Sequence, residues 1–218
     1  MNLLSLWGQY IVPFLHGLAV TVELTVLGLV VAIVLGALVA ACRLSRLRLL
    51  RWLGAVYVDI LRSVPVLVLL FIAYYGLGQV GLKLSGVEAG TAALGVFYAA
   101  LFAEIFRGGF QSVQQGQHEA AQALGLGAWL RLWKVVAPQA FLAVVLPSTN
   151  EFSNIIKDTS LVVTIGVADL MSKAYEASAN TFQPMDMFVL AGLIYLCLYL
   201  VVARGLGRWE ANVQRRRS

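Results

Sequence analysis

Charged residues are scarce in this sequence, and their scarcity excludes an ordinary soluble domain. Only 12% of the 218 residues are Asp, Glu, Lys or Arg, whereas soluble globular domains contain about 25%. Hydrophobic residues make up 60% of the chain, and the mean hydropathy is +0.83. The sequence shows no internal repeat and no low-complexity tract. We therefore expect one integral membrane domain over residues 1–218.

Cysteine and histidine are equally rare. The two cysteines, Cys42 and Cys197, lie near or within separate apolar runs, so we expect neither a disulfide framework nor a metal site. His16 is expected at the outer membrane interface and His118 in a polar loop on the other side. Residues in different compartments cannot form one catalytic constellation, so we expect a protein that is not an enzyme.

The sequence also lacks a phosphate-binding loop. Such a loop needs a glycine directly before its lysine, but each lysine here follows another residue type: Lys83, Lys134, Lys157 and Lys173. We therefore expect this chain to hydrolyse no nucleotide through such a loop, and any energy from ATP would have to come from a separate chain. The alternative to a protein driven by a separate ATPase is a small self-sufficient channel or an ion-driven carrier. A carrier is expected to show inverted repeats or paired broken helices, and the sequence gives no sign of either.

Five apolar stretches can each cross a membrane as a helix, since about 20 residues span roughly 30 Å of hydrocarbon. No basic segment precedes the first stretch, which is too long for a signal-peptide core, so we expect it to be retained. The expected fold is all-α, with five transmembrane helices at about 14–42, 54–80, 87–111, 135–156 and 184–206.

Basic residues cluster in three segments: between the first two spans, around the loop after the third span, and at the C-terminus. Cytoplasmic segments of membrane proteins are enriched in Lys and Arg, so we expect the N-terminus outside and the C-terminus inside. This topology accounts for the net charge of +5 and the pI near 9.4, and we expect no nucleic-acid partner. The clustered residues are Arg43, Arg46, Arg48, Arg51, Arg107, Arg131, Lys134, Arg204, Arg208, Arg215, Arg216 and Arg217.

The polar loop at about 112–134 is not built to cross lipid. It contains the run Glu119-Ala120-Ala121-Gln122-Ala123-Leu124-Gly125, and Pro138 closes the segment that follows. Alanine side chains keep a helix narrow enough to enter a groove, and the glycine is expected to end or bend the helix. We place Glu119 near the helix start, where the helix dipole favours a negative charge. The pattern predicts a short helix that docks on another protein.

The spacing of this loop resembles the signature of ABC importer permeases: EAA, three residues, Gly, nine residues, then an Ile-x-Leu-Pro-like end. Val135 and Ala137 stand here for the usual Ile and Leu, and His118 separates Gln117 from Glu119. Further motifs are similar to polar amino acid permeases of the histidine, glutamine, arginine and opine type. They are Gly17-Leu18 with Thr21, Arg62-Ser63-Val64-Pro65 (Gly-Thr is usual at its centre), Ala103-Glu104-Ile105-Phe106-Arg107-Gly108-Gly109, Gly116-Gln117 and Lys157-Asp158-Thr159-Ser160-Leu161.

This resemblance implies a type I ABC importer permease in a bacterial cytoplasmic membrane. The loop would form a coupling helix that docks on a dimer of a separate ATPase, with Glu119, Ala120, Ala121 and Gly125 as the coupling residues. ATP and Mg would be bound by that ATPase, and no cofactor is expected in this chain. The resemblance also implies a second permease, identical or related, and an extracytoplasmic solute-binding protein. It leaves open which polar amino acid or related compound is carried.

Two pairs of charged residues lie within the expected spans. Asp59 with Arg62, and Glu104 with Arg107, are three residues apart, so each pair can neutralise itself on one helical face. We expect both pairs towards the cytoplasmic ends of their spans. Structural ion pairs are favoured over contact with substrate.

The stretch from Pro147 to Ser160 carries many polar residues. Asn150, Asn154 and Lys157 recur at helical spacing, and Glu151 and Asp158 fall on the adjoining stripe. Such a face cannot face lipid, because its polar groups would remain unsatisfied. It offers acceptors for an ammonium group and donors for a carboxylate, as a zwitterionic amino acid requires. A translocation path and a polar dimer seam are both open interpretations.

Overall fold

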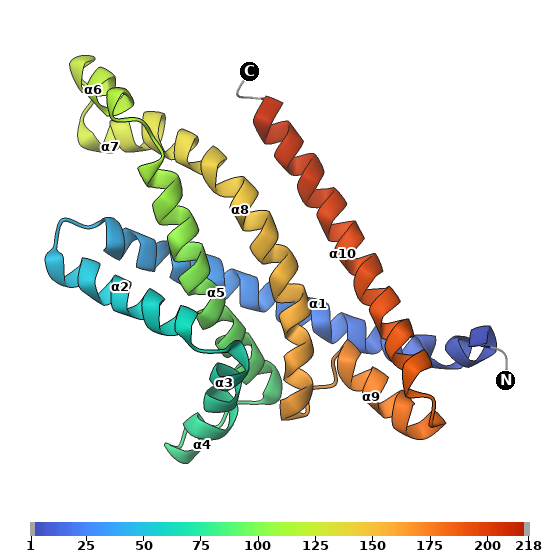
Figure 1. Cartoon of the computed structure of the whole chain (residues 1–218). Coiled ribbons are helices and arrows are strands. Elements are labelled where there is room, and N and C mark those ends of the chain that lie inside the picture. Colours follow the sequence, from blue (N-terminus) through green and yellow to red (C-terminus); the bar gives the residue numbers. More distant parts are fainter. Residues whose placement is uncertain (1–2, 216–218) are drawn as a thin grey trace.

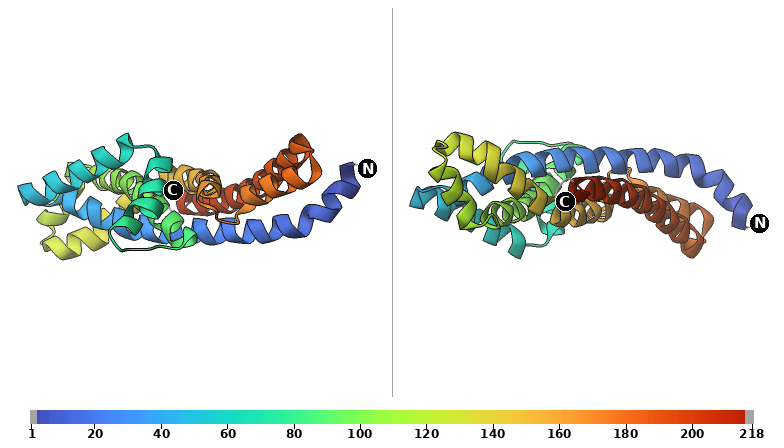
Figure 2. Two further views of the ribbon diagram at one scale, coloured as in Figure 1. Left: turned by 90° about the horizontal axis from the view of Figure 1, so that it is seen from below. Right: turned by 90° about the horizontal axis from the view of Figure 1, so that it is seen from above.

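The computed structural model of the chain describes residues 3–215, which form helices joined by short connections (Figure 1). Within that range there is no strand. Figure 2 shows α1 running along the length of the molecule, with the N-terminus at one end. The elements are α1 (Leu3–Leu44), α2 (Arg48–Ser63), α3 (Val66–Phe71), η1 (Ile72–Gly76), α4 (Leu77–Gln79), α5 (Gly86–Gln111), α6 (Gln115–Ala123), α7 (Ala128–Arg131), η2 (Leu132–Val136), α8 (Ala137–Asp158), η3 (Thr159–Ile165), α9 (Leu170–Thr181) and α10 (Pro184–Arg215).

The all-α membrane fold predicted from the sequence is confirmed. Among the described residues, four helical stretches are long and apolar enough to cross a membrane: Trp7–Leu44, Gly86–Gln111, Ala128–Ile165 and Pro184–Arg208. A bent pair of helices, Arg48–Ser63 with Val66–Gln79, is the fifth candidate span. The predicted spans correspond to these five segments, although α1 begins well before residue 14 and α10 continues past residue 206.

The second span differs from the prediction, because it is not one continuous helix. Its two parts meet at an angle of 103°, at a break where Val64 is extended (φ −102°, ψ 131°) and Pro65 directly precedes the next helix. Proline pushes the residue before it out of the helical region, and this effect ends α2 at Ser63. The bend therefore follows from Pro65, which the hydrophobic run alone does not reveal.

The fourth span begins earlier than predicted. Helical structure is nearly continuous from Ala128 to Ile165, because the π-helical turn η2 precedes Pro138 and lets the helix continue although proline brings no N–H. After this span, Gly166 adopts a left-handed conformation (φ 77°) and ends η3. The short helix α9 follows, and the sequence had not indicated it.

Helices α1 and α5 form the most extensive packing contact of the described range. A Cβ atom added at Gly36 would lie 2.8 Å from Cβ of Phe102, and one added at Gly95 would lie 2.5 Å from Cγ1 of Val31. Real Cβ atoms do not approach so closely, so both glycines are needed for this spacing. Helix α5 also packs on α2, α3 and α8, which places it at the centre of the bundle.

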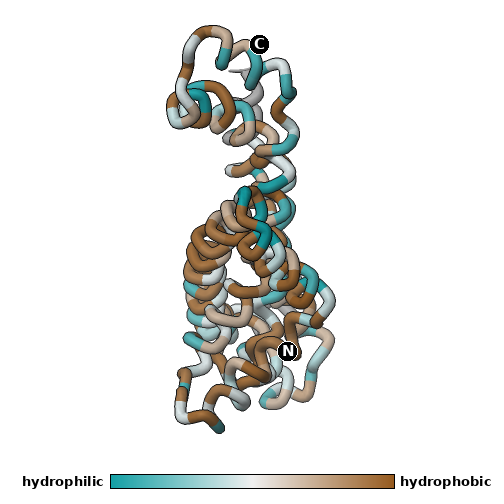
Figure 3. Tube along the Cα trace, turned by 90° about the vertical axis from the view of Figure 1, so that its left-hand side faces the viewer, coloured by the Kyte–Doolittle hydropathy of each residue, from teal (hydrophilic) through white to brown (hydrophobic). Residues whose placement is uncertain are grey.

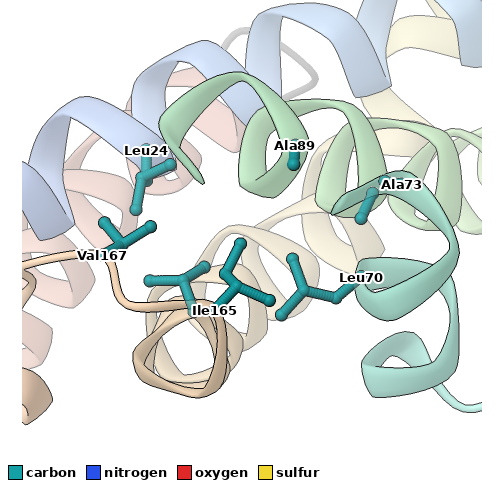
Figure 4. Close-up of a cluster of buried hydrophobic side chains, with 8 residues drawn as sticks. Leu24, Leu70, Ala73, Ala89, Ile165 and Val167 are labelled. Carbon is teal, nitrogen blue, oxygen red and sulfur yellow. The ribbon is translucent and has the colours of Figure 1, made fainter. Parts of the chain in front are cut away.

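The bent second span is held by a buried cluster. Leu70 and Ala73 pack with Leu24 of α1, Ala89 of α5 and Ile165 of η3 (Figure 4). Close packing of these side chains holds the bend against three other elements. In Figure 3, hydrophilic residues are more frequent in the half that carries the C-terminus, which in Figure 1 also carries α6 and α7.

Candidate functional site

Helix α6 lies at one end of the molecule, beyond the ends of α5 and α8 (Figure 1). Its last turn closes with two backbone bonds: Leu126 N–H donates to the Ala121 carbonyl at 3.1 Å, and Gly125 N–H donates to the Gln122 carbonyl at 2.9 Å. Gly125 is left-handed (φ 76°), the conformation that glycine adopts without strain at the end of a helix. The prediction that Gly125 ends this helix is confirmed, and its role in coupling stays a prediction.

The EAA run divides between two faces of α6. Ala121 is buried, at 3% exposure, and α6 contacts η2. Glu119 and Ala120 are exposed, so they are available for a partner. Glu119 lies in the second turn, because α6 already begins at Gln115. Our placement of Glu119 at the helix start was therefore wrong, and the dipole argument does not apply to it.

The polar stripe predicted on the fourth span is present on α8. Asn150, Asn154 and Lys157 are exposed in this chain, whereas Glu151 and Asp158 are half-buried beside them. Nδ2 of Asn154 donates a hydrogen bond of 3.3 Å to Oε2 of Glu151. An amide donor and a carboxylate acceptor therefore lie together on an open helical face.

The end of this stripe points to two different neighbours. The hydroxyl of Tyr98 on α5 donates to Oδ2 of Asp158 at 2.8 Å. Nζ of Lys157 lies 5.5 Å from the ring centroid of Tyr199 on α10, a cation–π distance. Neither tyrosine could be predicted from the sequence, because both lie on other helices and no local spacing connects them to the stripe.

The pair formed by Glu104 and Arg107 is confirmed, with 2.7 Å between Oε2 and Nη2. Arg43 of α1 also pairs with Glu104 through its Nη1, so one carboxylate binds two guanidinium groups. Arg107 also donates to the side-chain carbonyl of Gln111. The network joins the ends of α1 and α5 just before the chain enters α6.

The ion pair predicted between Asp59 and Arg62 is not among those formed by the described residues. Both residues are exposed in the last turns of α2, next to the bend at Pro65. They lie at the end of α2 opposite the basic α1–α2 connection, next to the break in the second span. Their place towards the cytoplasmic end of that span stays a prediction.

A buried carboxylate joins the start of α9 to α10. Asp169 is fully buried and caps α9 by accepting bonds from the N–H groups of Ser172 and Met171 at 2.9 and 3.2 Å. The Tyr195 hydroxyl donates to Asp169 at 3.4 Å. Burial raises the pKa of the Asp169 carboxyl, against the lowering effect of these bonds. An acidic residue before a short polar helix is an N-cap signal, and it was overlooked in the sequence.

Thr21 ties the start of α9 to α1, because its Oγ1 accepts a bond of 3.2 Å from Leu170 N–H. Among the residues that the structure describes, His, Cys, Asp and Glu nowhere gather in a group of three that could hold a metal ion.

The chain is similar over most of its length to known membrane transport proteins. The family model described as "Binding-protein-dependent transport system inner membrane component" matches residues 32–214. The "Probable glutamine ABC transporter permease protein GlnM" of Bacillus subtilis is 34% identical over 215 residues, which cover 99% of each chain. The "Arginine transport system permease protein ArtQ" of the same organism is 34% identical, over 88% of each chain. The "Nopaline transport system permease protein NocM" of Agrobacterium fabrum is 38% identical, over 88% of this chain and 85% of its own.

Solved structures with the same fold are known. A crystal structure of an amino acid ABC transporter with histidines contains a chain that superposes with a TM-score of 0.91 at 30% identity, over 97% of this chain and 99% of its own. A chain of an inward-facing MetNI methionine ABC transporter superposes with a TM-score of 0.72 at 21% identity, over 93% of this chain and 95% of its own. The second likeness concerns the fold alone.

Proposed function

Because the chain belongs to the family of binding-protein-dependent transport system inner membrane components, we propose that it carries polar amino acids or related compounds across a bacterial membrane. It acts as the permease subunit of an ABC importer. The observation that supports the substrate class is the polar face of α8, where Asn150 and Asn154 are exposed and Glu151 lies half-buried beside them. Relatives named for glutamine, arginine and nopaline transport agree with this chemistry.

Asn150, Glu151 and Asn154 border the translocation path in this proposal. An amino acid presents an ammonium group, which needs acceptors, and a carboxylate, which needs donors. Oε2 of Glu151 and the amides of the two asparagines supply both. Lys157 and Asp158 stand at one end of the path, where Tyr199 and Tyr98 hold them.

Energy comes from a separate ATPase dimer, which binds ATP and Mg. The exposed face of α6, with Glu119 and Ala120, docks on this ATPase, and Gly125 sets where the docking helix ends. A second permease, identical or related, completes the path, and an extracytoplasmic solute-binding protein delivers the substrate. The basic α1–α2 connection and the loop around α6 face the cytoplasm, the N-terminus lies outside and the C-terminus inside.

Docking is tested by enlarging one exposed alanine of α6. Ala120→Arg should abolish uptake and release the ATPase from the purified complex while the permease stays inserted, because the bulky side chain cannot enter a narrow groove. Gly125→Pro should have the same effect, because proline cannot adopt the positive φ of that position. Ala128→Arg, at an exposed alanine outside α6, is the matched control. Normal uptake by a well-expressed Ala120→Arg protein would refute docking through α6.

Orientation is tested by cysteine labelling in a background without Cys42 and Cys197. A membrane-impermeant reagent should label Asn180→Cys, which is exposed at the end of α9, and should not reach Gln214→Cys. The clustering of arginine at the C-terminus is the reason for this expectation. The reverse labelling pattern in intact cells would invert the proposed topology.

A further inference from the structure

The segment that joins α6 to α8 contains a local change of helix type. Residues Leu132–Val136 form the π-helical turn η2, and Ala137 N–H donates to the carbonyl of Leu132, five residues earlier. Pro138 follows in the first turn of α8 and brings no N–H to the helical ladder. The turn before Pro138 therefore has fewer backbone donors than carbonyl acceptors. Single π turns inside α-helices are frequent at functional sites.

The side chain of Gln139 supplies donors at this position. Its Nε2 donates to the Val135 carbonyl at 3.0 Å and to Oε1 of Gln117 on α6 at 3.2 Å. A carboxamide nitrogen carries two hydrogens, so it can make both bonds at once. Since a backbone carbonyl only accepts, Val135 fixes the orientation of the Gln139 amide, and Gln117 must then present its oxygen. One side chain thus links α6 to the backbone of η2.

The start of α8 is also packed tightly on the end of α5. A Cβ atom added at Gly109 would lie 2.4 Å from Cγ2 of Val144 and 3.0 Å from the carbonyl oxygen of Ala140. Val113, Val136 and Ala140 are buried together in the same region. Close packing resists a sideways shift of α8 towards α5. A displacement of α6 therefore reaches α8 through η2 and the bonds of Gln139.

We propose that Gln139 is a positioning residue for transport: it links α6 to α8, and η2 is the turn that changes when α6 moves. Gln139 and the polar stripe lie on the same helix, Ala137–Asp158. A rotation that starts at η2 therefore turns Glu151 and Asn154 with it. This inference rests on the proposed function, because it requires α6 to be docked on the ATPase.

The hydrogen bond between Gln139 and Gln117 forms a bridge from α8 to α6. Glutamate substitutions at these two residues separate a positioning role from an effect of charge. A carboxylate only accepts hydrogen bonds, so Gln117→Glu keeps the acceptor that Gln139 needs, whereas Gln139→Glu removes both donors. Gln114→Glu places the same charge on the exposed residue just before α6 and is the matched control. The measurement is the amount of substrate imported per ATP hydrolysed by the complete transporter in proteoliposomes, together with recovery of the ATPase.

Gln139→Glu should lower the amount of substrate imported per ATP by at least about fivefold, because it loses two hydrogen bonds and one typical hydrogen bond corresponds to about that factor; ATPase recovery should be unchanged. Gln117→Glu keeps the acceptor and should lose less than Gln139→Glu, and Gln114→Glu should stay within about twofold of the wild type. If Gln139→Glu fails to assemble, Gln117→Leu removes the bond between α6 and Gln139 and should lower the same ratio.

A wild-type ratio in an assembled bridge-breaking variant would overturn the inference, as would equal losses in Gln117→Glu and Gln139→Glu. The proposed function itself has a separate test, which is recovery of the ATPase with the wild-type permease. If no ATPase accompanies the wild-type permease, docking fails and the positioning role fails with it. ATPase recovery therefore distinguishes the two failures.

Discussion

Helices α5 and α8 both cross the bundle and carry polar residues, but the polar side chains of the two helices differ in burial and in their partners. In the most apolar part of each span, 56% of α5 is buried within this chain, against 17% for the stretch Ala128–Ile165 that contains α8. On α5, Glu104 binds two arginines. On α8, Asn150 and Asn154 remain exposed. The comparison indicates that α5 is the scaffold of this chain, whereas one face of α8 is built for contact outside it.

A substitution in the contact between α5 and α8 should have the largest effect on the packing of these two helices. Gly109→Leu should destabilise the protein by about 3 kcal/mol, because its side chain would collide with Val144 and the backbone of Ala140. Gly108→Leu is the matched control, since a Cβ atom there meets nothing within 4 Å. Thermal unfolding in detergent measures both. Equal melting temperatures for the two variants would show that α5 and α8 are not packed as described.

Glu104→Gln tests the scaffold role of α5. Removing the carboxylate charge leaves Arg43 and Arg107 without their partner in a largely buried place, so stability should fall by about 2 kcal/mol. The loss should decrease at high salt if the residual charges are screened. Unfolding midpoints of the wild type and variant, with transport assayed in the surviving folded fraction, check this result. Unchanged stability with altered substrate preference would move Glu104 from the scaffold to the path.

The sequence predicted the helices of this fold well and their distant contacts poorly. Hydrophobic runs indicated all five spans, and Gly125 indicated the end of α6, because both signals are local. The pairing of Arg43 with Glu104 joins residues 61 positions apart, and no local pattern reveals such a contact. The bend at Pro65 was missed because hydropathy outweighed the proline signal. Helix α9 was missed because it is short and has no long apolar run.

In the candidate site, too, local features could be predicted from the sequence and contacts between distant residues could not. Helical periodicity predicted the stripe from Asn150 to Asp158, since the spacing alone places those residues on neighbouring faces. It could not show that Asp158 contacts Tyr98 or that Lys157 contacts Tyr199. The bridge from Gln139 to Gln117 was equally out of reach, because it depends on how the loop folds back against α8.

Glu151→Gln is the measurement that tests the central claim, and it is the same chemical change on α8 as Glu104→Gln on α5. Uptake kinetics and recovery of the assembled transporter should be measured together in reconstituted vesicles. If α8 borders the path, transport changes while recovery and stability stay at wild-type levels. A cationic substrate should lose most, by about 1–3 kcal/mol of interaction with the carboxylate. Unchanged kinetics with reduced recovery would contradict the account and assign this face of α8 to the seam between two permeases.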